Sequence, residues 1–138
     1  MRFLVDTNRI IAALIRDSVS RRIIFHFNAE LITISLAEEE IRKHKEEIIT
    51  KAKVSEAEFD EIYHQLFERL TILNQDAVKR YRDKARAIMD PIDPDDTQFI
   101  AAALATNAEI WSDDHHFQQQ KKIKIWRTKD VVQFIEKS

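Results

Sequence analysis

The sequence contains no glycine among its 138 residues. P-loops, dinucleotide-binding turns and the glycine loops of kinases all need this residue, because a backbone without a side chain approaches a phosphate closely and adopts positive φ freely. We therefore do not expect a nucleotide-cofactor site of these kinds. Tight turns have to be built from Asn, Asp and Pro instead, and we expect them at residues 74–76 and 90–94.

Cysteine is also absent, which excludes disulfides, thiolate zinc sites and a cysteine nucleophile. Long apolar segments are missing as well. The charge of Asp6 comes too early for the apolar core of a signal peptide. The apolar runs at 10–15 and 99–105 are much shorter than the roughly 18 residues that span a bilayer. We expect a soluble, cytoplasmic protein without membrane contact.

Neither sign of charge is in large excess, since the formal net charge is -2 with 33% charged residues. The chain therefore has no overall basic field that would attract nucleic acid. A polyanion would have to be held by a local patch or through bound cations. With 44% apolar residues and only two prolines, residues 1–138 are expected to form a single domain with an ordinary buried core.

Short β-branched runs alternate with longer helical patterns, which predicts an α/β fold with a parallel sheet and crossover helices. The expected strands are 2–5, 31–34, 71–73, 109–111 and 124–126. The expected helices are 9–16, 20–27, 36–52, 55–70, 76–89, 95–106 and 131–137. Ser55 and Glu58 have the spacing of a capping box at the start of the fourth helix.

Asp6 is the first residue after the predicted strand 2–5, and an apolar helix follows it. In an open α/β sheet, ligands collect beyond the carboxyl ends of the strands, where this side chain would lie. The same residue could simply cap the helix that follows. The sequence leaves both roles open.

Asp96 stands at the start of the buried face of a predicted helix, whereas Asp95 is rotated by about 100° and faces elsewhere. The apolar residues that follow at i+3, i+4, i+7 and i+8 are Phe99, Ile100, Ala103 and Leu104. A carboxylate at a helix start is stabilised by the helix dipole, so capping is again the simpler role. An ionised group that faces inward needs a partner or a metal, because unpaired burial is expensive.

Three glutamates, Glu38-Glu39-Glu40, open the predicted helix 36–52. The buried stripe of this helix, read at helical spacing, is Ala37, Ile41, His44, Ile48 and Ala52. Glu39 lies opposite the stripe and is expected to be solvated. Glu40 flanks the stripe on the side of His44 and is the best candidate to face a cleft, while Glu38 at the other edge stays an alternative.

The segment Ser112-Asp113-Asp114-His115-His116 follows the predicted strand 109–111. Two acids and two imidazoles could form a transition-metal site. Adjacent histidines rarely bind one ion together, and no third ligand has a suitable spacing. We therefore favour an oxygen-ligand site or a solvated loop over a zinc site.

All of these acidic positions lie near strand ends or helix starts, so a single parallel sheet would gather them at one edge. Mg²⁺ and Mn²⁺ take carboxylate and water oxygens as ligands and leave positions open for a substrate phosphate. Bound cations would explain how a net acidic protein acts on nucleic acid.

With Asp6-Thr7-Asn8, Glu40, Asp96 and Ser112-Asp113-Asp114 present in this order, the chain resembles the PIN-domain family over nearly its whole length. The segments 35–48 and 93–117 carry the most specific likeness. It looks closest to compact single-domain PIN proteins, many of which are VapC-type ribonuclease toxins of toxin-antitoxin pairs. The resemblance implies a three-layer α/β/α fold around a mostly parallel sheet of about five strands.

The resemblance also assigns roles to residues. The acids expected to bind one or two Mg²⁺ or Mn²⁺ ions and to carry catalysis are Asp6, Glu40, Asp96 and Asp114. The residues expected to support them through hydrogen bonds or charge are Asn8, Ser112 and Asp113. The chain departs from many relatives at Arg9, where they have an aliphatic residue, and near His116, where they have a further acid.

The activity implied by the resemblance is metal-dependent hydrolysis of RNA phosphodiester bonds that leaves a 5′-phosphate and a 3′-hydroxyl. A protein antitoxin and a second copy of the chain are the implied partners, and Arg9 is a candidate contact to the RNA backbone, although such arginines more often form a solvated helix face. The alternative is a non-catalytic α/β domain that binds a divalent ion for regulation or binds a partner protein.

Overall fold

The computed structural model describes residues 1–16 and 18–137. Its sheet has the strand order β3-β2-β1-β4-β5, and every pairing is parallel. The strands are β1 (Arg2–Val5), β2 (Glu30–Ile34), β3 (Leu70–Leu73), β4 (Glu109–Trp111) and β5 (Ile125–Trp126). The predicted parallel sheet is confirmed.

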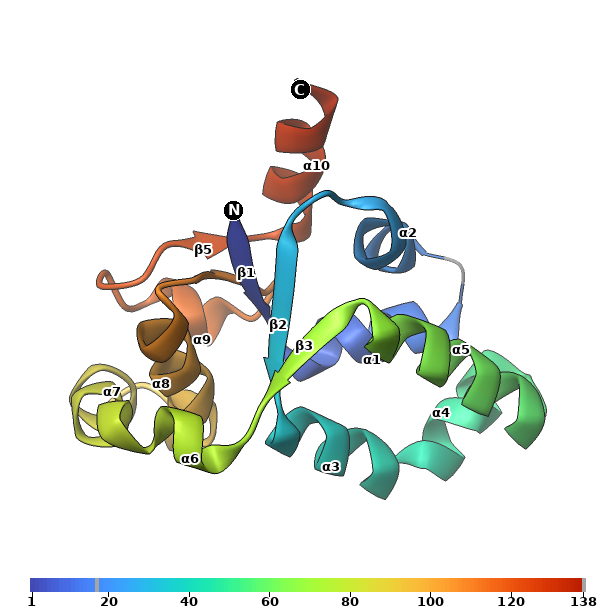
Figure 1. The fold of residues 1–138 in the computed structure, drawn as a ribbon, viewed down its shortest axis with the longest axis horizontal. Coiled ribbons are helices and arrows are strands. Elements are labelled where there is room, and N and C mark those ends of the chain that lie inside the picture. Colours follow the sequence, from blue (N-terminus) through green and yellow to red (C-terminus); the bar gives the residue numbers. More distant parts are fainter. Residues whose placement is uncertain (17, 138) are drawn as a thin grey trace.

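Helices cover both faces of this sheet (Figure 1). On one side lie α1 (Thr7–Ile15), α2 (Val19–His26) and α5 (Glu56–Glu68), with α3 (Ser35–Lys43) and α4 (Lys45–Ala52) packed against α1. On the other side lie α6 (Gln75–Val78), α7 (Arg82–Met89) and α8 (Thr97–Thr106). The expected three layers are confirmed.

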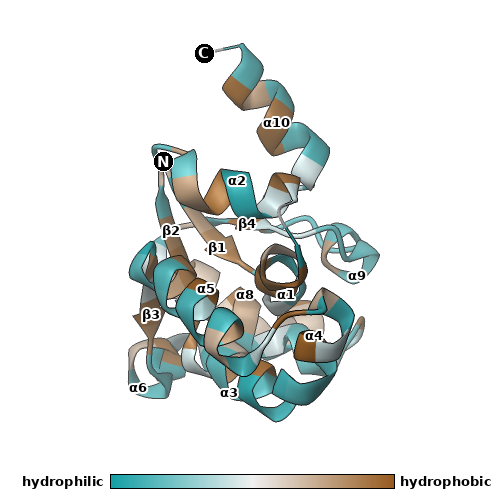
Figure 2. Ribbon diagram, turned by 90° about the vertical axis from the view of Figure 1, so that its right-hand side faces the viewer, coloured by the Kyte–Doolittle hydropathy of each residue, from teal (hydrophilic) through white to brown (hydrophobic). Residues whose placement is uncertain are grey.

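Short elements complete the chain. Two 3-10 turns, η1 (Lys79–Tyr81) and η2 (Pro94–Asp96), precede α7 and α8. The one-turn helix α9 (His115–Gln118) follows β4, and α10 (Thr128–Glu136) projects from the body beside α2 (Figures 1 and 2). Within the described ranges, no helix combines the length and the apolar character needed to cross a membrane.

The order of the strands contains a topological switch. From β1 the chain moves outward to β2 and β3, then returns to the other side of β1 to form β4 and β5. Crossover connections on the two sides of β1 run in opposite directions, and open α/β sheets bind their ligands at the carboxyl ends of the strands at such a point, here β1 and β4. Val5 pairs with Trp111 at this point, so the residues after each meet at one edge.

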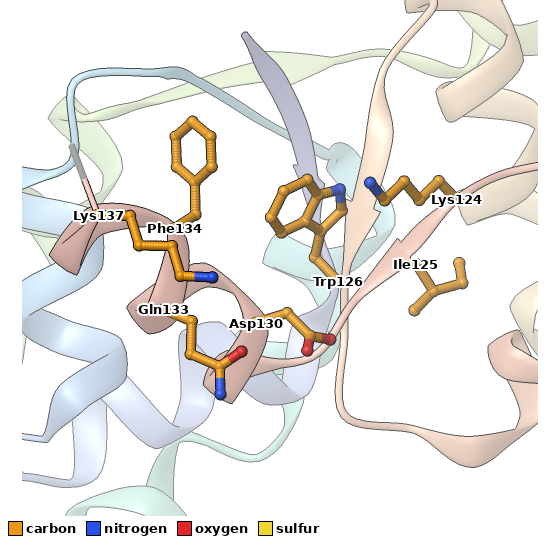
Figure 3. A pocket seen from close by; sticks show the side chains of 7 residues that line it. All are labelled: Lys124, Ile125, Trp126, Asp130, Gln133, Phe134 and Lys137. Atoms are coloured by element: carbon orange, nitrogen blue, oxygen red, sulfur yellow. The ribbon is translucent and has the colours of Figure 1, made fainter.

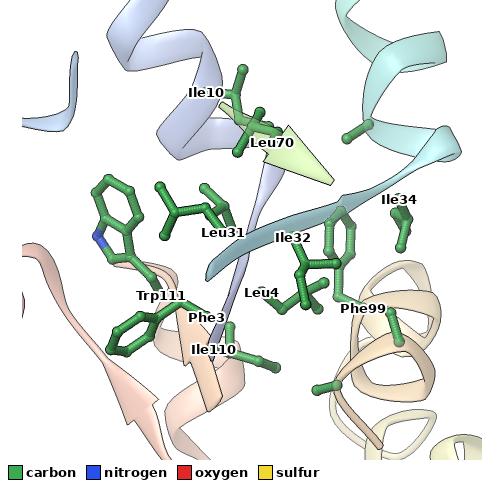
Figure 4. Close-up of a cluster of buried hydrophobic side chains, with 14 of the residues drawn as sticks. Phe3, Leu4, Ile10, Leu31, Ile32, Ile34, Leu70, Phe99, Ile110 and Trp111 are labelled. Carbon is green, nitrogen blue, oxygen red and sulfur yellow. The ribbon is translucent and has the colours of Figure 1, made fainter. Parts of the chain in front are cut away.

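The core lies on both faces of the central strands. Phe3, Leu4 and Val5 are each at most 1% exposed, as expected for a parallel strand covered by helices on both sides. Figure 4 shows Leu4 and Ile32 towards Phe99 of α8 and Leu31 towards Ile10 of α1, and Figure 2 shows apolar residues along the strands. The site acids that follow the strands are therefore held by the best-packed part of the molecule.

Two segments predicted as single helices are interrupted. The predicted helix 36–52 breaks at His44, whose φ of -105° and ψ of 16° end α3 and begin α4. Its ring is exposed, so its predicted place in the buried stripe is wrong. Ile41 and Ile48 are buried on either side of the break and preserve the helical spacing, which is why periodicity gave no sign of it. The predicted helix 76–89 is likewise divided into α6, η1 and α7.

The missing glycines have visible consequences for the backbone. Lys53 and Asn107 end α4 and α8 in the left-handed conformation, with φ of 57° and 54°. Glycine is the usual residue at such positions because it has no Cβ to clash. Asn74 caps α6 and Asp93 caps η2, so Asn and Asp occupy the turns expected of them.

Candidate metal centre

The acidic residues gather at the switch point between β1 and β4. Asp6 directly follows β1 and is the N-cap of α1, which confirms the capping role that the sequence offered for it. It is only 5% exposed. One carboxylate oxygen accepts a hydrogen bond from the Arg9 backbone N–H at 2.9 Å, and the other accepts from the Ser112 hydroxyl. Burial raises the pKa of Asp6, and these hydrogen bonds oppose the rise.

Ser112 connects two of the acids. It is fully buried after β4, donates to Asp6, and its Oγ accepts the backbone N–H of Asp114 at 3.0 Å. Asp114 in turn caps α9, because its Oδ1 accepts from the His116 backbone N–H at 2.9 Å. Asp6, Ser112 and Asp114 thus form a continuous chain of hydrogen bonds that connects the ends of β1 and β4 to the start of α9.

Asp96 reaches the same place from the other side, where η2 passes into α8. Its Oδ2 is buried and has no hydrogen-bond partner among the described residues. Burial, together with the negative charges of Asp114, Asp93 and Asp6, raises the pKa of Asp96 to about 7. Such a raised pKa marks a carboxylate that lacks compensation in the protein alone.

Glu40 is the outermost of the four predicted acids. It is half-buried on α3, and burial raises its pKa while the neighbouring Thr7 hydroxyl, one residue after Asp6, opposes the rise. Glu38 instead accepts a hydrogen bond from the Tyr63 hydroxyl on α5 at 3.4 Å. Between the two alternatives, the structure thus brings Glu40 towards the site and turns Glu38 towards α5.

Arg9 and Asp113 pair with each other at the rim of the site. The guanidinium Nη1 lies 2.8 Å from Asp113 Oδ2. The same carboxylate accepts from the Thr128 N–H at 2.8 Å and its hydroxyl at 2.7 Å, and so holds the start of α10. Asp113 is therefore occupied by these partners, and Arg9, predicted as an RNA contact, is already in an ion pair. Asn8 is exposed in the first turn of α1.

Two further residues join the acids that the sequence did not single out as ligands. Asp93 caps η2 and places its Oδ2 3.3 Å from Nδ1 of His116, which also lies 3.2 Å from Asp114 Oδ1. Candidate ligand atoms of Asp93, Asp96 and His116 all lie within 4.8 Å of one another. An Asp before Pro94 is a recognisable cap of a short helix, and this signal could have placed Asp93 beside Asp96.

The donor set fits a divalent cation. Several carboxylates converge, and the buried Asp96 Oδ2 lacks a partner that a metal ion would supply. Carboxylate oxygens are the ligands that Mg²⁺ and Mn²⁺ prefer. Ligand atoms of Asp114, His115 and His116 also lie within 4.8 Å of one another, but the His115 side chain is 79% exposed, so a zinc site that uses both histidines is not favoured.

Two pockets on the surface of the protein lie away from these acids. One, of about 440 Å³, is lined by Trp126, Phe134, Lys124 and their neighbours (Figure 3). The other, of about 770 Å³, lies between α2 and α10. Neither lining includes a predicted metal ligand. The acidic residues therefore lie apart from both of these pockets.

The fold and the clustered acids make the chain an α/β protein with an acidic site at the carboxyl edge of a parallel sheet. Comparison with known families then identifies its family. A sequence model of the PIN domain matches residues 4–135. The chain therefore belongs to the PIN-domain family, which confirms the resemblance found in the sequence. No curated protein matches the chain.

Solved structures that share the fold include two VapBC complexes. The crystal structure of VapBC2 from Rickettsia felis bound to a DNA fragment from their promoter matches with a TM-score of 0.68 at 16% identity, covering 92% of this chain and 98% of that chain. VapBC-1 from nontypeable Haemophilus influenzae matches with a TM-score of 0.64 at 21% identity, covering 94% and 99%. The chain is thus a PIN domain similar in fold to chains of VapBC complexes.

Proposed function

We propose that the protein is a metal-dependent endoribonuclease in which Asp6, Glu40, Asp96 and Asp114 hold one or two Mg²⁺ or Mn²⁺ ions. The observation that carries the proposal is the buried, unpartnered Asp96 Oδ2 facing a group of like charges. Membership of the PIN-domain family supports the same reaction. A divalent cation bound here would lower the pKa of a bound water molecule and neutralise negative charge on a phosphodiester.

The residues of the chain have distinct tasks in this proposal. Ser112 orients the Asp6 carboxylate and accepts the Asp114 backbone N–H, and the His116 backbone N–H holds Asp114 Oδ1, so oxygens of both acids are positioned before a metal binds. Arg9 and Asp113 hold the start of α10 beside β4. Asn8, exposed next to Thr7, is available to a substrate phosphate or a water at the rim.

The test is Mn²⁺-dependent cleavage of structured RNAs by the purified protein, compared with Asp6→Asn and Asp96→Asn. We expect each substitution to lower the rate about 100-fold or more, since a catalytic metal contributes several kcal/mol to transition-state stabilisation. Asp95→Asn is the matched control, because Asp95 is exposed and adjacent to Asp96. It should keep most of the activity.

Several outcomes would contradict the proposal. Cleavage that survives both substitutions, or that persists in chelator, would exclude the acidic site as its source. Metal binding without cleavage of any RNA would favour the alternative, a divalent-ion-binding regulatory or partner-binding domain. Unfolding curves of the variants separate a loss of chemistry from a loss of folding.

We also propose that the protein acts as the toxin of a toxin-antitoxin pair and assembles as a homodimer. The support is the similarity in fold to chains of VapBC complexes. Expression alone should arrest growth, and co-expression of a small protein from the adjacent reading frame should relieve the arrest. Unimpaired growth would contradict the toxin role and leave the nuclease proposal standing, and light scattering of the purified protein tests the dimer.

A further inference from the structure

The acidic site contains an imidazole at a place where its ligands were expected to be oxygens. His116 lies in α9, two residues after Asp114, and its side chain is 36% exposed. Its Nδ1 stands between two carboxylate oxygens, 3.3 Å from Asp93 and 3.2 Å from Asp114. His116 thus borders the acids without belonging to the four predicted ligands.

These separations match those of ligands that share one ion. Two ligand atoms about 2.1 Å from an octahedral ion and at right angles to each other lie about 3 Å apart, and about 3.4 Å apart around a tetrahedral ion. The observed distances of 3.2 and 3.3 Å fall between these values. Asp93, Asp96 and His116 come together in one group of candidate ligand atoms.

The group also holds two polar atoms that the protein leaves unsatisfied. His116 Nδ1 and Asp96 Oδ2 are both buried, and neither has a hydrogen-bond partner among the described residues. Although Nδ1 is close to two carboxylates, its orientation makes a hydrogen bond to neither. Buried polar atoms are normally paired, so two such atoms in one group point to a missing ligand.

We propose that Asp93 and His116 extend the acidic site and, with Asp96, form a mixed nitrogen and oxygen cation subsite that favours Mn²⁺ over Mg²⁺. The inference rests on the proposed metal-dependent function and specifies the ion for that same site. Mg²⁺ strongly prefers oxygen ligands, whereas imidazole suits transition-metal ions, whose affinity for nitrogen-containing sites rises from Mn²⁺ through Co²⁺ to Ni²⁺. A neutral His116 ring supplies that nitrogen.

The experiment uses the purified full chain, stripped of metal and titrated calorimetrically with Mn²⁺ and with Mg²⁺. Pulsed electron paramagnetic resonance of bound Mn²⁺ then detects a directly coordinated ¹⁴N nucleus without any assay of activity. The variants are His116→Asp, which restores an all-oxygen set, and His116→Asn, which removes the imidazole without adding charge. His115→Asp is the control, because it adds the same charge at the exposed neighbouring position.

In the wild type we expect ¹⁴N coupling to bound Mn²⁺. His116→Asp and His116→Asn should abolish it, and His115→Asp should retain it. The ratio of Mg²⁺ to Mn²⁺ dissociation constants should fall about 10- to 100-fold in His116→Asp. The inference would be overturned if the wild-type protein bound Mn²⁺ through oxygen ligands alone, or if the ¹⁴N coupling persisted in the variants without His116.

The results also separate the two proposals. If Mn²⁺ binds through oxygen alone while RNA cleavage still depends on Asp6 and Asp96, only the His116 subsite is excluded. If nitrogen coupling is present but no RNA is cleaved, the subsite stands and the nuclease proposal fails. A protein that binds no divalent cation contradicts both.

Discussion

The acidic site has two halves that differ in how well the protein satisfies them. In the first half, at the ends of β1 and β4, Asp6, Ser112 and Asp114 are joined by hydrogen bonds. In the second half, formed by η2 and α9, Asp96 Oδ2 and His116 Nδ1 are buried and accept or donate no hydrogen bond among the described residues. The first half is therefore arranged by folding alone, whereas the second half keeps two polar atoms that a bound cation would satisfy under the proposed function. A site that combines both is pre-organised and still has free energy to gain from binding a cation.

The largest change in stability should come from the hydrogen-bonded half. Ser112→Ala removes the donor to Asp6 and the acceptor of the Asp114 N–H in a fully buried place. Leaving buried polar groups unpaired should lower the free energy of unfolding by about 1–3 kcal/mol. Urea unfolding in the presence of chelator measures this loss of stability. An unchanged midpoint would show that the chain of hydrogen bonds is not what holds this half together.

Because of the half with unsatisfied groups, the stability of the metal-free protein should depend on pH. Because the pKa of Asp96 rises from 3.8 to about 7 on folding, the folded state binds this proton more tightly than the unfolded state. Its contribution to stability is fully present below about pH 4 and is lost as the pH rises through about 7. Unfolding curves in chelator should therefore show stability falling over this range.

The matched variant for that measurement is Asp96→Asn, which keeps the shape of the side chain and removes its charge. The fall in stability between pH 4 and pH 7 should become smaller, because the contribution of Asp96 is lost while Asp6 and Glu40, whose pKa values are also raised, still contribute. Excess Mn²⁺ should likewise reduce the fall in the wild type, since a cation favours the ionised carboxylate. A wild-type profile identical to that of Asp96→Asn would contradict the assignment.

The smallest expected effect lies outside the site and tests whether backbone strain follows from the missing glycines. Lys53→Gly should raise the free energy of unfolding by up to about 1 kcal/mol, because Lys53 adopts a left-handed conformation at φ of 57°. Asn107→Gly should gain less, since Asn tolerates this conformation better than Lys. Thermal unfolding measures both, and a larger gain at Asn107 would refute the ranking.

Much of the fold was predictable because its information is local. Strand β1 and strand β4 have the predicted boundaries, and the capping box at Ser55 and Glu58 is present. Such features depend on a few neighbouring residues. The break at His44 was not predictable in this way, since Ile41 and Ile48 continue the helical spacing across it.

The candidate site was predictable to a smaller extent. The sequence singled out Asp6, Asp96 and Asp114 on their places after strands and at helix starts, and the structure brings these three within range of one another's charge. The closeness of Asp93 to His116 was not predicted, because it depends on how η2 and α9 face each other. The pairing of Arg9 with Asp113 was missed for the same reason.

The sequence by itself determined the kinds of element, the absence of glycine and cysteine chemistry, and an order of acids typical of the PIN-domain family. Only the tertiary structure decided the strand order, and with it the switch point where β1 and β4 end side by side. The reason is the range of the interactions. Helix and strand patterns depend on residues a few positions apart. Ser112 and Asp6 are 106 positions apart, and their hydrogen bond forms only when β1 pairs with β4.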